Sequence, residues 1–583
     1  MSLRLTLLAS AALLTACSSE PERQPGEGAD HVLWQGAIYT ASDNQPWAEA
    51  IAIKGNRIVY VGGNKGVEAF VGKNTKVTDL DDKMVTPGFI DTHAHPAMAA
   101  GMSDSVELDL NGTPDEWKQA VTDYIKENPD KPYVMGFGFL AATFGPSGPT
   151  KEMLDEIVSD RPVVLIDEGG HTAWVNSKAF ELAGIDKNTL DPIPGTHFYK
   201  RDADGNPTGW CLEAMTFNPM IAKLGMISKE SILEGAEDLF WLMTSFGITT
   251  SYDAGMSQFE EVSYPALAEL EASQKLPFRI ISSHMIQDPK QVPTAIERLR
   301  YLNKTYSSAL IQPRVMKIHN DGTKEAFTAG QFDDYVGQPG NKGSVLLEGP
   351  ALQDFVVDID QAGFDIHIHA IGDRAVDEAL DAFEIARKIN PDSNVRYAIG
   401  HTELVRDEDL ARFGALNVTA QTTPVWFATD GAGEIAAVGA DRAAKLYRFD
   451  AIERAGGKVT FGSDFPAAGV PGLSPLYNIE VGMTRQYPNA PNMPVTPPVD
   501  ARLSLDTMLK GYTIHAAYQL NMENDIGSLE VGKLADLTVL NANLFNIKKH
   551  DVHKVRVSMT MMDGNITYER GLKTRLFEWD SGL

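Results

Sequence analysis

The chain has few cysteines and no excess of positive charge. Its 583 residues include only two cysteines, Cys17 and Cys211, which leaves little room for disulfide bonds. Lys and Arg number 51 against 79 Asp and Glu, so the net charge is −28. This charge opposes phosphate backbones and excludes nucleic acid from the expected partners. With 43% hydrophobic and 22% charged residues, the composition is typical of a soluble globular protein. The length is too great for one small core, so we expect one large domain and a smaller one.

Long apolar runs are also scarce. The run at residues 5–14 is too short to span a membrane but fits a secretory signal. It ends in Leu14-Thr15-Ala16-Cys17, which resembles the bacterial lipoprotein signal. We therefore expect cleavage of residues 1–16, a lipid on Cys17, a tether at 17–30, and an exported lipoprotein that faces the periplasm or the cell exterior. With Cys17 lipidated, Cys211 has no internal disulfide partner; an ordinary cleaved signal with a fortuitous cysteine is the alternative.

Both ends of the chain are rich in β-strand patterns. VLWQGAIYT and AEAIAIKGNRIVYVGG alternate apolar and polar residues, with a turn at residues 54–56. GSLEVGKLADLTVLNANL and VRVSMTMMDGNITYE, with a turn at Asp563-Gly564, show the same pattern near the other end. Neither end has enough strands to close a core. We therefore expect residues 31–86 and 522–583 to form one composite β-sandwich domain.

The middle of the chain alternates strand-like and helix-like segments. Stretches such as DRAVDEALDAFEIARKI repeat apolar residues at helical spacing. Eight β-then-α units predict an α/β fold, a (β/α)8 TIM-like barrel over residues 87–521 with its chemistry at the C-terminal strand ends. The first unit is too long and predicts an inserted region at roughly 97–245, above the barrel mouth. The eight strand candidates are GFIDTHAH, GITTSYDAG, FRIISSHM, IQPRVMKIHNDG, GFDIHIHAIGD, VRYAIGHTE, NVTAQTTP and KVTFGSDFP.

Several of these strands end in a residue that can bind metal. His93 and His95 are two positions apart, so both imidazoles share one face of the first strand. Such a pair alone is ambiguous, but in a barrel the ends of all strands form a ring around one mouth. The later strands add Lys317, His369, His401 and Asp464. Together these residues predict a centre for divalent metal ions.

The same segments carry a family resemblance. PGFIDTHAH, HAIGD, GH, GSDFP and GSLEVGKLADLTVL resemble the metal-dependent amidohydrolase superfamily. HTAWVNSKAF, GNPTGWCLEA, GITTSYDAG and VMKIHNDGT are similar to its amidohydrolase family 3, or YtcJ-like, branch, which includes N-substituted formamide deformylases. The resemblance covers essentially the whole mature chain, with the motifs in the right order.

The resemblance implies two divalent metal ions, with zinc first and manganese, iron or nickel as alternatives. His93, His95 and Asp464 would hold the more buried ion. His369 and His401 would hold the other. Lys317 would add carbon dioxide and bridge both ions as a carbamate; its alternative is a plain cation that pairs with Asp321 or Asp464.

Further polar residues have proposed roles. Asp464 would accept the proton of the attacking water and pass it to the leaving nitrogen. By the resemblance, His171 would bind a substrate or transition-state oxygen, and Arg374 and Glu213 are further substrate-binding candidates. His319 and His367 share the strand faces of proposed ligands and are rivals for their roles. His369 is preferred to His367, which is interpreted as a packed layer residue, whereas His319 stays open as a supporting or core residue.

The predicted activity is hydrolysis at a carbonyl, of an amide such as an N-acyl or N-formyl compound. A deaminase, a lactonase, an ester hydrolase or an inactive tethered binding protein are the alternatives. A serine esterase lacks support because no G-x-S-x-G motif is present. Residues 136–141 fit G-x-G-x-x-A, but the following ATFGPSGPT breaks any helix. Expected partners are a small-molecule substrate, the membrane through the lipid on Cys17 alone, and a second copy of the chain in a homodimer.

Overall fold

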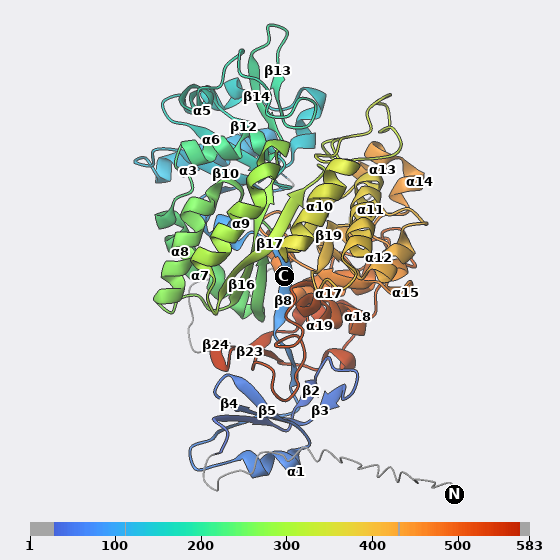
Figure 1. The fold of residues 1–583 in the computed structure, drawn as a ribbon. Coiled ribbons are helices and arrows are strands. Elements are labelled where there is room, and N and C mark those ends of the chain that lie inside the picture. Colours follow the sequence, from blue (N-terminus) through green and yellow to red (C-terminus); the bar gives the residue numbers. More distant parts are fainter. Residues whose placement is uncertain (1–27, 111, 429–431, 572–583) are drawn as a thin grey trace, which may run out of the picture.

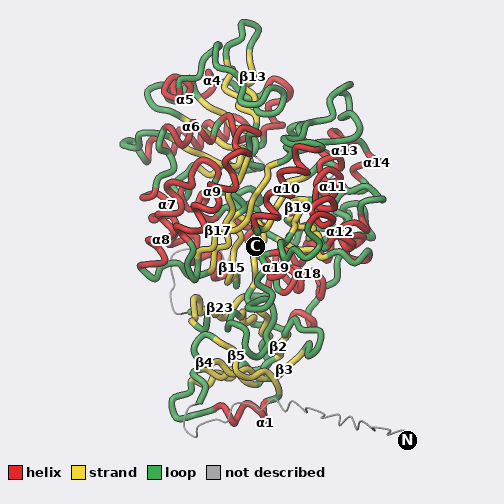
Figure 2. Tube along the Cα trace, viewed as in Figure 1, coloured by secondary structure: helices red, strands yellow, loops and turns green. Residues whose placement is uncertain are grey.

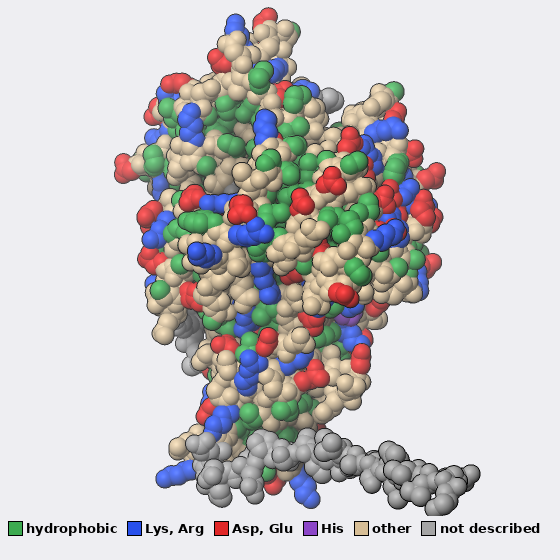
Figure 3. Space-filling model, in the orientation of Figure 1, with side chains coloured by type: hydrophobic (Ala, Val, Ile, Leu, Met, Phe, Trp, Pro, Cys, Tyr) green, Lys and Arg blue, Asp and Glu red, His purple; other side chains and the backbone are tan. Residues whose placement is uncertain are grey.

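The computed structural model describes residues 28–110, 112–428 and 432–571. The expected signal, Cys17 and most of the tether lie outside these residues. The molecule is elongated, with a β-rich domain at one end, the barrel in the middle and the inserted region at the other end (Figure 1). Acidic and basic side chains are interspersed over the face drawn in Figure 3. No helix within the described ranges has both the length and the apolar character needed to cross a membrane.

The central sheet has eight parallel strands, and all eight strand predictions are confirmed. It follows the order β21-β20-β19-β18-β17-β16-β15-β8, so neighbours in the sheet are also successive along the chain. The strands are β8 (Phe89–Ala94), β15 (Ile248–Asp253), β16 (Arg279–Ile286), β17 (Ile311–His319), β18 (Asp365–Ala370), β19 (Tyr397–His401), β20 (Val418–Thr422) and β21 (Lys458–Phe461). This arrangement is a (β/α)8 barrel that is nearly closed.

The outer layer consists of helices that lie against the strands (Figure 2). In α11 (Asp373–Ile389), the apolar residues repeat every three or four positions and are buried, whereas Arg387 and Lys388 stand in the last turn, where cations favour the helix dipole. The other main helices are α7 (Lys229–Ser245), α8 (Glu260–Ala272), α9 (Val292–Tyr306), α10 (Pro350–Ala362), α12 (Leu410–Leu416), α15 (Phe449–Arg454), α17 (Pro475–Thr484), α18 (Leu505–Gly511) and α19 (Ile514–Gln519).

The β-rich domain combines both ends of the chain, as predicted. One sheet has the order β5-β4-β1-β6, and the other has the order β24-β23-β22-β7-β2-β3, in which β7 pairs antiparallel with β22. The predicted turns at residues 54–56 and 563–564 join β4 to β5 and β23 to β24. The strands are β1 (His31–Trp34), β2 (Ala37–Tyr39), β3 (Trp47–Ala48), β4 (Ala50–Lys54), β5 (Arg57–Gly62), β6 (Lys76–Asp79), β7 (Met84–Pro87), β22 (Leu537–Leu540), β23 (Val557–Met562) and β24 (Asn565–Glu569).

The inserted region between β8 and β15 forms a sheet of its own. Its order is β13-β14-β12-β11-β10-β9, and it lies at the end of the barrel opposite the β-rich domain (Figure 1). Trp117, Phe139 and Trp174 are buried in its core. Its strands are β9 (Val106–Glu107), β10 (Val134–Phe139), β11 (Val163–Asp167), β12 (Thr172–Val175), β13 (Phe198–Arg201) and β14 (Pro207–Leu212). The nearby helices are α2 (Pro96–Gly101), α3 (Pro114–Glu127), α4 (Lys151–Asp155), α5 (Ser177–Ala183) and α6 (Asn218–Lys223).

A buried ion pair joins the barrel to the β-rich domain. Arg279, the first residue of β16, lies 2.8 Å from the carboxylate of Asp536, and both side chains are at most 3% exposed. Asp536 also accepts a hydrogen bond from the backbone N–H of Asp563. The two partners come from parts of the chain that are 257 residues apart. The pair therefore fixes the position of the barrel floor on the composite domain.

We predict that Arg279→Met lowers the free energy of unfolding by about 3–5 kcal/mol, because it leaves the Asp536 carboxylate buried without a counter-ion. The double variant Arg279→Met/Asp536→Asn should recover most of this loss. Thermal unfolding followed by circular dichroism tests both expectations. A single variant as stable as the wild type would show that the pair does not join the two domains energetically.

Candidate metal centre

A cavity of about 110 Å³ opens at the C-terminal ends of the barrel strands, below the inserted region. All six predicted metal ligands line it: His93, His95, Lys317, His369, His401 and Asp464. His171 and His319 line it as well. The structure therefore brings together residues that are separated by up to several hundred positions in the sequence.

One group of donor atoms consists of His93, His401 and Asp464, whose ligand atoms lie within 4.8 Å of one another. Asp464 Oδ1 lies 3.5 Å from His93 Nε2 and 3.4 Å from His95 Nε2. Its other oxygen lies 3.8 Å from His401 Nδ1. The His369 ring is 4.3 Å from the His401 ring, so His401 lies between this group and a second one.

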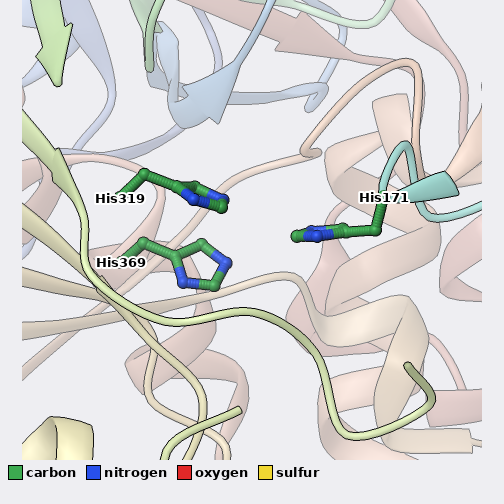
Figure 4. Close-up of side chains that lie close together, drawn as sticks. All are labelled: His171, His319 and His369. Atoms are coloured by element: carbon green, nitrogen blue, oxygen red, sulfur yellow. The ribbon is translucent and has the colours of Figure 1, made fainter. Parts of the chain in front are cut away.

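The second group consists of His171, His319 and His369, again within 4.8 Å. His319 and His369 lie one above the other at the ends of β17 and β18, and His171 from the inserted region faces them (Figure 4). Their ring centroids are 4.4 Å apart for His319 and His369, and 5.6 Å apart for His171 and His319. His319, which the sequence left open, therefore belongs to the cavity. Its position two residues after Lys317 on one strand face is the signal that pointed to it.

Backbone geometry directs two of these side chains inward. His401 and Asp464 have φ values of 70° and 49°, a left-handed conformation that costs about 1–3 kcal/mol in most residues. The backbone N–H of Asp464 donates to the carbonyl of His93 at 2.6 Å, which holds the end of β21 against β8. Asp91 strengthens this contact, because its carboxylate accepts hydrogen bonds from both the N–H and the hydroxyl of Ser463.

The outer nitrogens of three histidines are already engaged. Nδ1 of His93 lies 2.9 Å from the Gln421 side-chain oxygen, and Nδ1 of His95 lies 3.0 Å from the Gly255 carbonyl. Nδ1 of His369 lies 2.9 Å from Asp321, whose carboxylate also accepts N–H groups from the segment after β18. The opposite nitrogen, Nε2, is therefore the one that an ion would use on each ring; on His93 and His95 it lies 3.5 and 3.4 Å from Asp464. For His369, this buried atom has no hydrogen-bond partner in the described part of the chain.

Lys317 is buried between the two groups. Its Nζ lies 3.5 Å from His93 Nε2, and burial lowers its pKa to about 7 although the charge of Asp464 opposes the change. No carboxylate of the described residues lies within ion-pair distance of Lys317; Asp321 contacts His369 instead. For Asp464, burial raises the pKa, but the hydrogen bond from His95 and the neighbouring positive groups outweigh it and lower the pKa to about 2.

Glu213 contacts His171 and not the cavity. Its carboxylate lies 2.6 Å from His171 Nδ1 and accepts a hydrogen bond of 2.7 Å from the hydroxyl of Thr328. Burial disfavours the charged imidazole, but the charge of Glu213 prevails and raises the pKa of His171 to about 9. Arg374 also lies outside the cavity lining, because it pairs with Glu348 and Glu378 at the start of α11.

His367 lies below the cavity. It stacks on Tyr252, with ring centroids 5.1 Å apart, and it does not line the cavity. This placement agrees with its interpretation as a packed layer residue. Two of the aromatic residues near the mouth lie at the cavity: Phe137 lines it, and Trp426 stacks on His401. Phe139, Phe144 and Trp174 instead pack against one another inside the inserted region.

Comparison with known proteins agrees with this geometry. A family model described as "Amidohydrolase family" matches residues 76–568. The exoenzymes regulatory protein AepA of Pectobacterium carotovorum is 34% identical over 404 residues, which cover 68% of this chain and 85% of that protein. The N-substituted formamide deformylase of Arthrobacter pascens is 26% identical over 554 residues, covering 93% and 98%.

A solved structure from Pyrococcus furiosus, described as an uncharacterized metal-dependent hydrolase, is similar over 88% of this chain and 99% of its own, with a TM-score of 0.66 and 26% identity. The resemblance stated from the motifs is therefore confirmed. Because the family model spans the whole barrel and the adjoining parts of the composite domain, the chain belongs to the amidohydrolase family and is a hydrolase of the metal-dependent amidohydrolase superfamily.

Proposed function

We propose that this protein uses two divalent metal ions, zinc first, to hydrolyse the carbon–nitrogen bond of a neutral amide such as an N-formyl or N-acyl compound. The observation that carries the proposal is the convergence of two donor groups on one cavity, with Lys317 between them. Each group offers nitrogen atoms, and one adds a carboxylate. Nitrogen and oxygen donors in this combination suit zinc.

The residues fit metal ions because hydrogen bonds at Nδ1 fix the orientation of three histidine rings. A metal-binding histidine generally donates its outer N–H to a carboxylate or carbonyl, which fixes the ring and leaves the other nitrogen for the ion. Gln421, Gly255 and Asp321 occupy these outer positions for His93, His95 and His369. The buried Nε2 of His369 without a partner is the atom that an ion would satisfy.

A bound divalent ion would supply Lewis acidity and lower the pKa of a water in the cavity. Asp464 is ionised at neutral pH, lines the cavity, and would accept a proton from that water and pass it to the leaving nitrogen. His171, held by Glu213, donates a hydrogen bond to the oxygen on which negative charge develops. The sequence assigned Glu213 to the substrate; its contact with His171 favours a positioning role instead.

Lys317 is suited to carboxylation. Burial keeps a large fraction of its amine neutral at pH 7, and the neutral nitrogen attacks the carbon of carbon dioxide, loses a proton to solvent and becomes a carbamate anion. Two carbamate oxygens at this position would complete both donor groups.

The chemistry of the wall favours an uncharged substrate. Apart from the histidines, Lys317 and Asp464, no charged side chain lines the cavity within the described ranges. A substrate carboxylate or ammonium far from the reacting bond would therefore be buried without a counter-ion, at a cost of several kcal/mol. The similarity to an enzyme named N-substituted formamide deformylase agrees with a neutral amide.

We predict two ions per chain in protein purified without chelator, one beside Asp464 and one beside His319 and His369, with His171 left as a hydrogen-bond donor and not a ligand. Removal of the metal should abolish hydrolysis of N-formyl amines, and added zinc should restore it.

Asp464→Asn should lower kcat by about 10²–10⁴-fold, because it removes the proton acceptor. Elemental analysis and amide-hydrolysis assays measure these effects, with Asp354→Asn on the exposed face of α10 as control. A metal-free protein that still cleaves amides would contradict the proposal.

Asp321→Asn should weaken metal binding by about 10–100-fold, because an amide no longer fixes the His369 ring as the carboxylate does. The measurement is competition with a chelator of known affinity, with the same control variant. Unchanged affinity would mean that His369 does not hold metal through Nε2.

Reconstitution of metal-free protein in isotope-labelled bicarbonate should give a carbamate carbon signal by nuclear magnetic resonance, because the buried amine of Lys317 is largely neutral. Lys317→Met should lack the signal and bind fewer ions, whereas Lys388→Met on the surface of α11 should behave as the wild type. A signal that persists in Lys317→Met would assign the carbamate elsewhere.

A further inference from the structure

The wall of the cavity away from the metal ligands is almost entirely apolar. The inserted region supplies much of it, and α2, the end of β16 and the segment after β21 add to it. Its apolar side chains include Met98, Met102, Phe137, Ile166, Phe217 and Met285. Three of these are methionines, whose flexible side chains adapt to ligands of different shape. An apolar arm of a substrate fits this wall.

Two neutral polar side chains interrupt this wall, Gln287 and Asn218, and only Gln287 has an interaction with another described residue. Asn218, the first residue of α6, lines the cavity and is only 8% exposed. In the part of the chain that the structure describes, its side-chain amide has no hydrogen-bond partner. It makes no ion pair or hydrogen bond with a histidine, Lys317 or Asp464 there. The amide is not among the fully buried unpartnered groups, so solvent reaches it through the cavity. A ligand that displaces this solvent leaves the amide unsatisfied, at a cost in free energy, unless the ligand itself supplies a polar group.

We propose that Asn218 determines specificity by hydrogen bonding to an uncharged polar group on the apolar arm of the substrate. This inference rests on the proposed amide hydrolysis at the same cavity. Water satisfies the amide while the cavity is open to solvent. Once an apolar arm fills the wall, only a polar atom of the substrate itself can take that place. The substrate class is therefore a neutral amide whose apolar arm bears a hydroxyl, ether, carbonyl or second amide.

Charge on the arm is excluded by the same wall. Asn218 is neutral, and its apolar neighbours offer no counter-ion. Sites that hydrogen-bond a substrate group reject the analogue without it, because the buried partner in the protein is then left unpaired. The expected discrimination is thus between hydroxylated and plain analogues and between neutral and charged ones.

Two matched pairs of amides test the proposal. N-formyltyramine and N-formylphenethylamine differ by a hydroxyl on the amine side, and 4-hydroxyphenylacetamide and phenylacetamide differ by one on the acyl side. The metal-loaded wild type should show a kcat/KM about tenfold or more higher for the hydroxylated member of at least one pair. Asn218→Leu, which is similar in volume, should remove this preference.

Controls separate this effect from a general disturbance of the cavity. Met220→Leu changes a buried residue of the same helix that does not line the cavity, and it should keep the preference. Asn218→Ser shortens the side chain and removes the amide, so it should also lose the preference. This second variant answers the question if Asn218→Leu does not fold.

The outcomes distinguish the two proposals. If the wild type shows no preference in either pair, or if Asn218→Leu and Asn218→Ser keep it, Asn218 does not determine specificity while amide hydrolysis stands. If the metal-loaded wild type cleaves none of the four amides nor any other amide, the proposed function itself is overturned, and the role of Asn218 with it.

Discussion

The contact between the first and last barrel strands is the constraint on which the rest of the structure depends. No ladder pairs β8 with β21 in the described residues, and the barrel closes through the hydrogen bonds of His93, His95 and Asp464 with the facing strand ends. Gly462 allows this approach, because a Cβ there would lie 2.4 Å from the His93 nitrogen. The residues that close the barrel are thus also the residues that meet at Asp464. The contacts that close the barrel therefore also bring His93 and Asp464 of the first donor group together.

The remainder of the centre depends on partners behind the ligands. Asp321, Gln421 and the Gly255 carbonyl fix three imidazoles, and Glu213 fixes His171. Each ring is therefore oriented in advance, which lowers the entropic cost of gathering several side chains around one point. Strained backbone at the ends of β19 and β21 is the cost of directing their ligands inward.

The sequence predicted much of this arrangement, because strand and helix periodicity is local. It identified the eight barrel strands, the composite domain, the position of the insertion and seven cavity-lining residues, the six proposed metal ligands and His171. It could not predict that Glu213 turns to His171 or that Asp321 supports His369, since those directions depend on loops and on positive φ values that no residue pattern encodes. The place of Asn218 in the wall likewise depends on how the inserted region folds back, which is a tertiary property.

The β-rich domain and the inserted region lie at opposite ends of the molecule. The first described residues enter the β-rich domain at the end opposite the inserted region (Figure 1), so the cavity, which lies between the barrel and that region, is at a distance from them. If a lipid on Cys17 holds the protein at a membrane, as we propose, the composite domain would lie between the membrane and the barrel. Substrates would then reach the cavity from the bulk solution without passing between the protein and the membrane.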